Sequence, residues 1–460
     1  MIVMKFGGTS VADPAAIERL IGIVRAERQV QIQPESGDWR GPIVVVSALS
    51  GVTDRLLGVA AEAVAGDAEG IRTNLRDLRD RHSRIASVIL DAAERADVIA
   101  FVNRELDELE RVVLALAVLQ EVSPRWLDAI ASMGETLSSR IVASALTTHG
   151  LAASWVDARR VMVTEADHTA AAPLVPETTA ALAEVVDPLL RARRIPVVGG
   201  FVGATRDGVT TTLGRGGSDY SAAMIGACLE ADEIQIWTDV DGMLTADPRL
   251  VPNTRVVPHL SFAEASELAY FGAKVLHPAT IQPAVARNIA VRILNSQVPT
   301  ARGSLITETR PPSATPVTAI ASKKAVTVVD ITSTRMLMTH GFLRRLFEIF
   351  ERHKTSVDVV TTSEVSVSVT IDDRRRLPAI VKELSEFASV SCEDEMAIVC
   401  IVGEGLQKDP ALVGQLIAAV EGVPLKLVSQ AASRRNVTVV VREADLTVVL
   451  RRLHDRFFAA

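Results

Sequence analysis

From residue 1 to about residue 300 the chain alternates short β-branched runs with helical stretches, and this alternation constrains its fold most strongly. The runs are GPIVVVSA (41–48), ASWVDARRVMV (153–163), IPVVGGFVG (195–203), VTTTLG (209–214), EIQIWTDVDG (233–242) and VRILNS (291–296). A long helical region, from about Ala60 to Leu119, separates the first two. The pattern predicts an α/β sheet with helices on both faces, in which ligands bind where glycine-rich turns follow the strand ends.

The proline-containing stretch ETRPPSATP (308–316) marks the best domain boundary, because the pattern changes after it. Two successive segments then read as strand, helix, strand, strand, helix, without the glycine-rich turns of the first part. We therefore predict a first domain over 1–305, a linker over 306–316 and two small modules over 317–396 and 397–460.

Composition excludes several classes of protein. The 460 residues carry a formal net charge of −7 and no basic stripe, which argues against nucleic-acid binding. The start lacks the layout of a signal peptide, and no run of apolar residues is long enough to span a membrane. Cys228, Cys392 and Cys400 have no metal-ligand spacing, and we expect them to be reduced core residues. A cytoplasmic protein is expected.

The opening MIVMKFGGTSV (1–11) predicts a buried strand followed by a tight turn. Its exposed amides, the Thr9 and Ser10 hydroxyls and the Lys5 ammonium could bind a phosphate, especially if Asp13–Arg25 is the next helix. The spacing is not that of a P-loop, so an ordinary strand–turn–helix junction is the alternative.

The stretch TTTLGRGGSDYSAAMIGACLEA (210–231) gives the strongest signal. A strand ends at Leu213, a glycine loop surrounds Arg215, and Ser218 or Asp219 is expected to cap the next helix. A capped turn with a surface arginine is the alternative, but three glycines around one arginine favour backbone contact with an anion.

Two further segments supply carboxylates. WTDVDGMLTADPR (237–249) places Thr238, Asp239 and Asp241 at a strand end, and carboxylates beside a phosphate loop are typical of metal-bound nucleotides. In ASMGETLSSR (131–140), Glu135 starts a helix and could hold an ammonium group. Acidic turns and helix starts without function are the alternatives.

Together these segments fit phosphoryl transfer by positioning and charge neutralisation. No H-R-D loop and no Ser-His-Asp order is present. A carboxylate acceptor is already ionised at pH 7 and needs no base, unlike an alcohol.

The motifs KFGGTSV, SMGE, TTLGRGGSDYSA, WTDVDG, TADPR and FGAKVLHPAT resemble those of aspartate kinases, in order and over the whole chain. The match is nearest to the monofunctional, lysine-sensitive type. The resemblance implies an amino-acid-kinase-type α/β/α sandwich followed by two ferredoxin-like (β-α-β-β-α) ACT modules. It implies transfer of a phosphoryl group from ATP to L-aspartate, giving 4-phospho-L-aspartate for lysine, threonine and methionine biosynthesis.

The resemblance also implies roles for individual residues. Catalysis is assigned to Lys5, Asp219 and Asp239. Aspartate would be bound by Ser47, Thr53, Glu135, Gly200 and Arg215. ATP, with Mg²⁺ held mainly through its phosphates, would be bound by Gly7, Gly8, Thr9, Ser10, Thr238, Asp239, Arg249 and Lys274.

The first C-terminal module is expected to bind lysine as an inhibitor. Aligning the modules places Asp358 opposite Lys426 and Glu364 opposite Asn436, so that acidic residues occur in one copy only, which suits a cationic ligand. Solvated loop charges are the alternative. By resemblance, the effector site comprises Met338, Gly341, Phe342, Leu343, Val357, Asp358, Ser363 and Glu364 at a homodimer interface; whether dimers pair into tetramers stays open.

The sequence leaves two alternative functions open. Kinases of the same fold act on glutamate, acetylglutamate, carbamate or UMP, and an amino-acid sensor with an inactive kinase domain is a second alternative. The latter would predict loss of Lys5, Glu135, Arg215, Asp219 or Asp239, all of which are present. No dinucleotide fingerprint follows the second module, so no fused homoserine dehydrogenase is expected.

Overall fold

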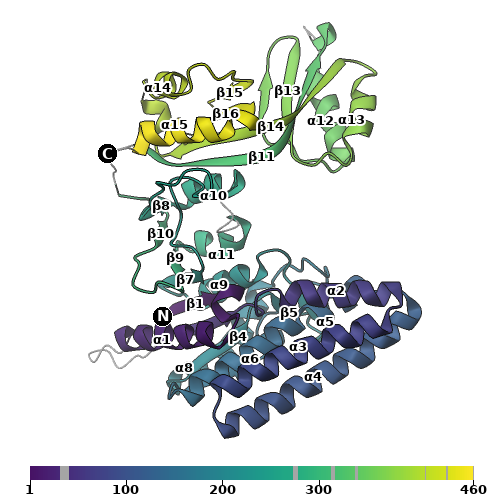
Figure 1. Ribbon diagram of the computed structural model, residues 1–460, viewed down its shortest axis with the longest axis vertical. Helices are drawn as coiled ribbons and strands as arrows, with labels where there is room; N and C mark the ends of the chain where they lie inside the picture. The colour runs from purple at the N-terminus through teal and green to yellow at the C-terminus, as the bar shows by residue number, and fades with distance from the viewer. Residues whose placement is uncertain are drawn as a thin grey trace. The chain divides into compact units, whose positions relative to one another are not determined.

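The computed structural model describes residues 1–31, 41–272, 278–311, 316–336, 340–409, 411–430 and 434–458. The chain divides into two compact units, whose elements are labelled in Figure 1. The first contains Met1–Met243, Pro258–Phe262 and Leu276–Arg310. The second contains Leu244–Val257, Ala263–Val275 and Pro311–Ala460.

The first unit is built on an eight-stranded sheet in the order β3-β4-β2-β1-β7-β9-β10-β8. The strands are β1 (Ile2–Phe6), β2 (Ile43–Val46), β3 (Ala153–Val156), β4 (Ile195–Gly199), β7 (Glu233–Thr238), β8 (His259–Ser261), β9 (Ala290–Asn295) and β10 (Ser304–Thr307). β10 runs antiparallel to β9, and the other neighbouring pairs are parallel. All four residues of β2 are buried, as expected for a parallel strand covered on both faces.

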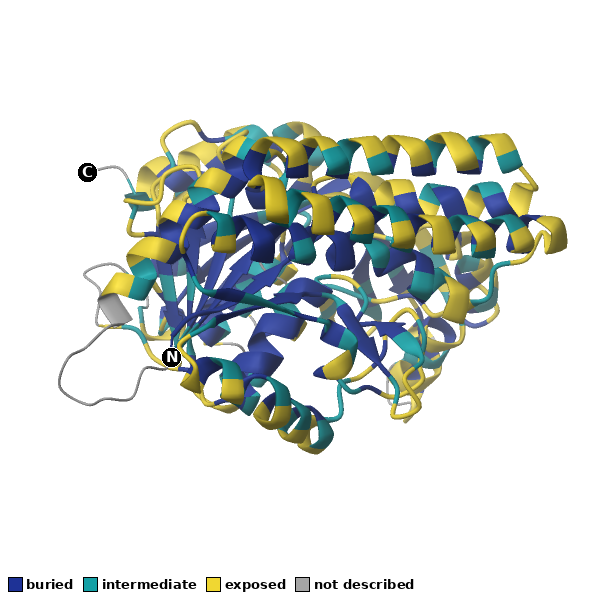
Figure 2. Cartoon of the chain, turned by 90° about the horizontal axis from the view of Figure 1, so that it is seen from below, coloured by how far each residue is buried: buried dark blue, intermediate teal, exposed yellow. Residues whose placement is uncertain are grey.

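Helices cover both faces of this sheet. One layer shares a core with Met4, Phe6, Val44 and Val46 and consists of α1 (Pro14–Gln31), α2 (Val52–Ala65), α3 (Ala68–Ile89), α4 (Ala92–Leu119) and α6 (Met133–Thr148). The other layer contains α7 (Val175–Val185), α8 (Asp187–Arg191), α9 (Gly217–Cys228) and α11 (Gln282–Ala286). Figure 2 shows the buried strands between more exposed helices. The predicted α/β/α sandwich is confirmed.

The long helical region expected from about Ala60 to Leu119 consists of the end of α2 followed by α3 and α4. Gly66 ends α2 with φ 73°, a conformation that favours glycine. Asp67 then caps α3 by accepting a hydrogen bond from the Gly70 amide, and Asp91 caps α4 in the same way. The remaining elements near the site are α5 (Pro124–Ala131) and a hairpin of β5 (Val202–Ala204) and β6 (Thr210–Thr212).

The second unit contains a six-stranded antiparallel sheet in the order β12-β13-β11-β14-β16-β15. Its strands are β11 (Val317–Thr332), β12 (Val360–Thr362), β13 (Ser366–Ile371), β14 (Ser389–Gly403), β15 (Leu427–Ser429) and β16 (Asn436–Arg442). Its helices are α12 (Phe342–Arg352), α13 (Leu377–Leu384), α14 (Leu412–Ala419) and α15 (Leu446–Phe458), with most of α10 (Phe262–Tyr270). The repeated strand–helix–strand–strand–helix pattern is confirmed.

The two modules share the long strands β11 and β14. Val329 and Ile331 pack in one core with α12 and α13, whereas Val317 and Ile320 pack in another with α14 and α15. The pairing of β11 with β14 is irregular near Ala325, whose φ is 57°. Each long strand therefore serves both cores, and the boundaries 1–305, 306–316, 317–396 and 397–460 stay a prediction.

The surface departs from one expectation. Cys400 is buried and Cys228 partly so, but Cys392 is exposed on β14, so it is not a core residue.

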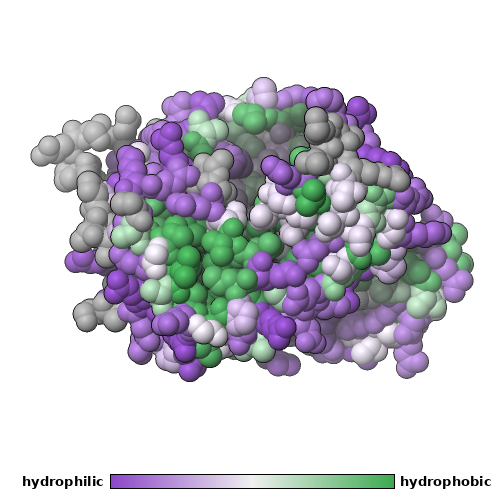
Figure 3. Space-filling model, turned by 90° about the horizontal axis from the view of Figure 1, so that it is seen from above, coloured by the Kyte–Doolittle hydropathy of each residue, from purple (hydrophilic) through white to green (hydrophobic). Residues whose placement is uncertain are grey.

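Figure 3 shows apolar side chains gathered in one area of the surface. In the described ranges, no helix combines the length and apolar character needed to cross a membrane.

Candidate active site

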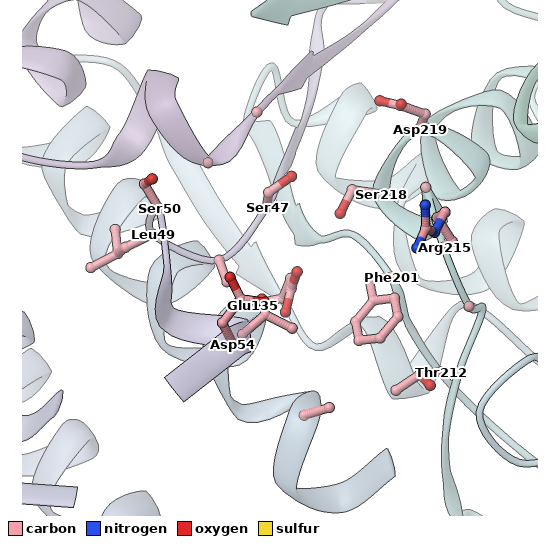
Figure 4. A pocket seen from close by; sticks show the side chains of 18 of the residues that line it. Ser47, Leu49, Ser50, Asp54, Glu135, Phe201, Thr212, Arg215, Ser218 and Asp219 are labelled. Atoms are coloured by element: carbon pink, nitrogen blue, oxygen red, sulfur yellow. The ribbon is translucent and has the colours of Figure 1, made fainter. Parts of the chain in front are cut away.

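A cleft of about 800 Å³ opens in the first unit where β1, β2 and β7 end (Figure 4). Eleven of the predicted site residues line it, brought together from segments far apart in sequence: Lys5, Gly7, Gly8, Thr9, Ser47, Thr53, Glu135, Arg215, Asp219, Thr238 and Asp239.

The turn after β1 forms one wall. The Gly7 amide donates a hydrogen bond to the Trp237 carbonyl at 2.9 Å, which joins the turn to β7. A Cβ on Gly8 would lie 3.0 Å from the Ala48 carbonyl, so glycine allows this close approach. Ser10 does not line the cleft: its buried hydroxyl lies 2.7 Å from that of Ser296. Its predicted contact with the nucleotide stays a prediction.

Lys5 and Asp219 form an ion pair inside the cleft. Lys5 Nζ lies 2.6 Å from Asp219 Oδ1, and the two side chains are 11% and 14% exposed. Lys5 comes from β1 and Asp219 from the first turn of α9. The pair joins a cation on the sheet to the helix that follows the glycine loop.

The glycine loop ends differently from the expectation. Gly216 is the N-cap of α9 with φ 72°, so Ser218 and Asp219 lie within the first turn and do not cap it. A Cβ on Gly217 would lie 2.6 Å from the Phe201 ring, which requires glycine there. Arg215 is exposed at the cleft and has no hydrogen-bond or ion-pair partner in the described part of the chain. Its guanidinium is available to an anion.

Glu135 provides the opposite charge on another element. It lies in the first turn of α6, is 4% exposed, and its Oε2 has no hydrogen-bond partner among the described protein atoms. Burial raises its pKa to about 8, although a backbone hydrogen bond from Ala48 and the charge of Lys5 act in the other direction. A buried carboxyl with one unpartnered oxygen suits a cationic group of a ligand.

Asp128 on α5 was not predicted from the sequence. Its carboxylate, 1% exposed, accepts hydrogen bonds from the Thr169 amide at 3.0 Å and the Thr212 hydroxyl at 2.5 Å, and lies 2.7 Å from His168 Nδ1. It thus ties α5 and the Thr169 loop to β6, the strand that leads into the Arg215 loop. These partners lie 40 to 84 residues away, so no local pattern indicates the network.

Phe201, Asp54 and Leu57 also line the cleft without having been predicted. Phe201 follows the Gly199–Gly200 pair with φ 65°, and its amide donates to the Ser221 hydroxyl at 2.9 Å. A bulky residue in this left-handed conformation is uncommon, and the sequence carries no signal for it.

Besides Ser10, the predicted residues Gly200 and Arg249 are not among the described residues that line the cleft. Gly200 lies against α9, where a Cβ would be 2.7 Å from Ser218 Cβ, and its role in binding aspartate stays a prediction. Arg249 belongs to the second unit and pairs with Asp247 at 2.7 Å. Lys274 lies outside the described residues, and the nucleotide roles of Arg249 and Lys274 stay predictions.

The predicted effector residues lie in the second unit. Gly341, with φ 84°, is the N-cap of α12, Phe342 is buried, Leu343 and Glu364 are exposed, and Val357 is partly buried. The Ser363 hydroxyl lies 2.6 Å from that of Ser366, and Met338 lies outside the described residues.

Asp358 already has partners within the chain. Its carboxylate, 3% exposed, lies 2.9 Å from Lys323 Nζ and accepts a hydrogen bond from the Tyr270 hydroxyl at 3.0 Å. Lys323 also pairs with Asp372 at 2.7 Å. In the other module Lys426 pairs with Asp330 and Glu393, each at 2.9 Å. The aligned positions Asp358 and Lys426 thus carry opposite charges, each internally neutralised.

Comparison with known families agrees with this geometry. The model of the amino acid kinase family matches residues 1–295, and a model of the ACT domain matches residues 399–457. The chain therefore belongs to the amino acid kinase family.

Its relatives define the group within that family. Aspartokinase 3, chloroplastic, of Arabidopsis thaliana is 36% identical, with 99% of this chain and 81% of that protein covered. Lysine-sensitive aspartokinase 3 of Escherichia coli is 35% identical, with 100% and 99% covered. The crystal structure of E. coli aspartokinase III in complex with aspartate and ADP, in its R-state, has a TM-score of 0.82 at 33% identity and covers all of both chains. The chain is an enzyme of the aspartokinase group.

Proposed function

We propose that the chain transfers the γ-phosphoryl group of ATP to the β-carboxylate of L-aspartate, giving ADP and 4-phospho-L-aspartate. The observation that carries this proposal is the placing of Glu135 and Arg215 on different elements of one cleft beside the Lys5–Asp219 pair. Arg215 would hold the α-carboxylate of aspartate and Glu135 its ammonium group, which leaves the β-carboxylate directed at the phosphoryl donor.

Lys5 would stabilise the negative charge of the phosphoryl group in the transition state, while the amides of Gly7, Gly8 and Thr9 surround it. Asp219 would orient the Lys5 ammonium. Ser47 and Thr53 line the same cleft and would bind aspartate. No general base is needed, because the acceptor carboxylate is ionised at neutral pH.

Thr238 and Asp239, at the end of β7, would contact the nucleotide with its Mg²⁺. The Asp239 carboxylate accepts a hydrogen bond from the Thr238 hydroxyl at 3.1 Å. Its oxygens are ligands of the kind that Mg²⁺ prefers. The described residues contain no group of three His, Cys, Asp or Glu side chains that could hold a metal. In the proposed reaction, Mg²⁺ would be held mainly by the phosphates, whose charge it would neutralise.

The reaction would be the first step of lysine, threonine and methionine biosynthesis, in the cytoplasm.

We further propose lysine as a feedback inhibitor bound in the first ACT module. The support is that E. coli aspartokinase III has been crystallised with lysine and aspartate in a T-state that matches this chain with a TM-score of 0.81. Lysine must bind the two states with unequal affinity in order to shift their populations. Equal lysine affinity with and without bound aspartate and nucleotide would refute this coupling.

A homodimer formed through the ACT modules is proposed as well. Its support is the set of exposed apolar side chains in this unit, which includes Leu343, Val360, Ile417 and Val428. Sedimentation analysis with and without lysine would test it, and a chain that stays monomeric under both conditions would contradict it.

A substrate panel tests the proposed reaction. ADP release by the purified chain should depend on aspartate and not on glutamate, acetylglutamate, carbamate or UMP. Equal release with another acceptor would reassign the substrate, and absence of release with every acceptor would favour an amino-acid sensor.

A further inference from the structure

A second cavity, of about 280 Å³, lies beside the edge strand β3 in the first unit. Helix α6, β3 and the residue before β4 provide most of its wall. The residues that matter here are Glu94, Arg140, Ser144, Ser154, Trp155 and Arg194. None of them lines the catalytic cleft.

Arg194 is fixed at the cavity by the edge strand. Its Nε donates a hydrogen bond to the Ser154 hydroxyl, and its terminal nitrogen donates to the Ala153 carbonyl, both at 2.5 Å. A guanidinium has five N–H donors, so the other donors remain for a further acceptor. Its planar geometry is held in place before any ligand arrives.

Arg140 and Ser144 add donors that the described protein atoms leave unused. They lie four residues apart on α6 and therefore on the same face of the helix. Arg140 is partly exposed and has no hydrogen-bond, ion-pair or ring partner within the described ranges. The Ser144 hydroxyl is buried, at 2% exposure, and likewise lacks a hydrogen-bond partner. Burying a hydroxyl without a partner costs free energy, which binding of an acceptor would offset.

The charges identify the kind of ligand. Two guanidinium groups and one carboxylate, that of Glu94, line the cavity, so it is net positive. Guanidinium groups bind planar or tetrahedral oxyanions through paired hydrogen bonds. We propose that this cavity binds a small oxyanion, the phosphate or carboxylate group of a metabolite, at a site separate from the catalytic cleft. Its ligand is held by Arg140, Arg194 and the Ser144 hydroxyl.

Trp155 provides a local reporter for this site. It lines the cavity, and its indole Nε1 donates a hydrogen bond to the Ser139 hydroxyl at 2.9 Å. The test is a ¹H–¹⁵N indole spectrum of the full chain, with the Trp155 signal assigned by Trp155→Phe. Aspartate and ADP are kept saturating to occupy the catalytic cleft. Inorganic phosphate, and separately succinate, is then titrated at constant ionic strength.

We expect a saturable shift of the Trp155 signal with at least one of these two anions. Arg140→Gln should weaken binding at least tenfold and Ser144→Ala several-fold, whereas Arg76→Gln, at an exposed arginine of α3, should leave it unchanged. Kinase activity should be retained in all three variants. Stronger binding of phosphate would assign a phosphate ligand, and stronger binding of succinate a carboxylate.

Two results would overturn the proposal. The first is a Trp155 signal that responds to neither anion, which would mean that water alone satisfies the cavity. The second is an identical titration in the wild type and in Arg140→Gln. If Arg140→Gln does not fold, Ser144→Ala, which removes a single hydroxyl, gives the same comparison.

Discussion

Lys5 Nζ lies 2.6 Å from Asp219 Oδ1, so the cation at the end of β1 is held by the first turn of α9. The ion pair joins the two glycine-rich turns that line the cleft. In the proposed mechanism, this largely buried positive charge would stabilise the negative charge that develops on the transferred phosphoryl group.

The first prediction concerns Lys5. Lys5→Ala should lower kcat by about 10²- to 10³-fold, the loss typical of removing one group that stabilises transition-state charge. Steady-state ADP release measures this, and lysine binding by calorimetry should be nearly unchanged. Lys324→Ala, at an exposed lysine of the second unit, is the matched control and should keep full turnover. Undiminished turnover in Lys5→Ala would remove Lys5 from the mechanism.

The second prediction concerns pH. Because burial raises the pKa of Glu135 to about 8, the carboxyl of the empty site is mostly protonated at neutral pH. The ammonium group of aspartate pairs with the ionised form, so kcat/KM for aspartate should rise with pH and level off above about 8.

Glu135→Gln provides the control for that profile. The variant should have a low kcat/KM without the rise near pH 8, since the titrating group is gone. The same rise in Glu135→Gln would show that another group produces it. Stability gives a second check: the folded empty site binds a proton more tightly than the unfolded chain, so this group makes stability fall as pH rises from about 4.5 to 8.

The third prediction concerns Asp128. Asp128→Asn replaces one acceptor oxygen by an N–H donor that faces groups already donating, so the variant should lose about 1–3 kcal/mol of stability. The KM for aspartate should rise, because β6 leads into the Arg215 loop. Chemical denaturation and steady-state kinetics measure the two effects. Exposed Asp167→Asn is the matched control, and an unchanged KM in Asp128→Asn would limit Asp128 to a structural role.

The fourth prediction concerns the effector module. Lysine bound at Asp358 would compete with Lys323, whose ammonium already lies 2.9 Å from that carboxylate. Lys323→Ala should therefore lower the lysine concentration needed for half-inhibition, and Asp358→Asn should raise it. Inhibition curves of both variants, with exposed Lys324→Ala as control, measure this. Unchanged inhibition in Asp358→Asn would exclude the carboxylate from the effector site.

Much of this architecture follows from local sequence. Strand runs followed by glycine-rich turns predict the parallel sheet and place Lys5 and Asp239 at the ends of its strands. Arg215, in the glycine loop after β6, and Glu135, at the start of a helix, line the same cleft. Glycine-rich turns can be recognised from the sequence because few other residues adopt their backbone conformations.

The rest depends on contacts that no local pattern encodes. The Asp128 carboxylate meets partners up to 84 residues away, and Phe201 adopts a left-handed conformation that its residue type does not favour. The sequence pattern also does not predict that the two modules share β11 and β14. The two halves of each long strand pack in different cores, and the strand pattern alone does not indicate this division.

The most direct test of the central claim is trapping of the product by hydroxylamine, which converts an acyl phosphate to a hydroxamate. With ATP, Mg²⁺ and L-aspartate, the purified chain should form aspartyl hydroxamate in a one-to-one ratio with ADP, and lysine should suppress both. ADP release without hydroxamate would contradict transfer to the β-carboxylate of aspartate.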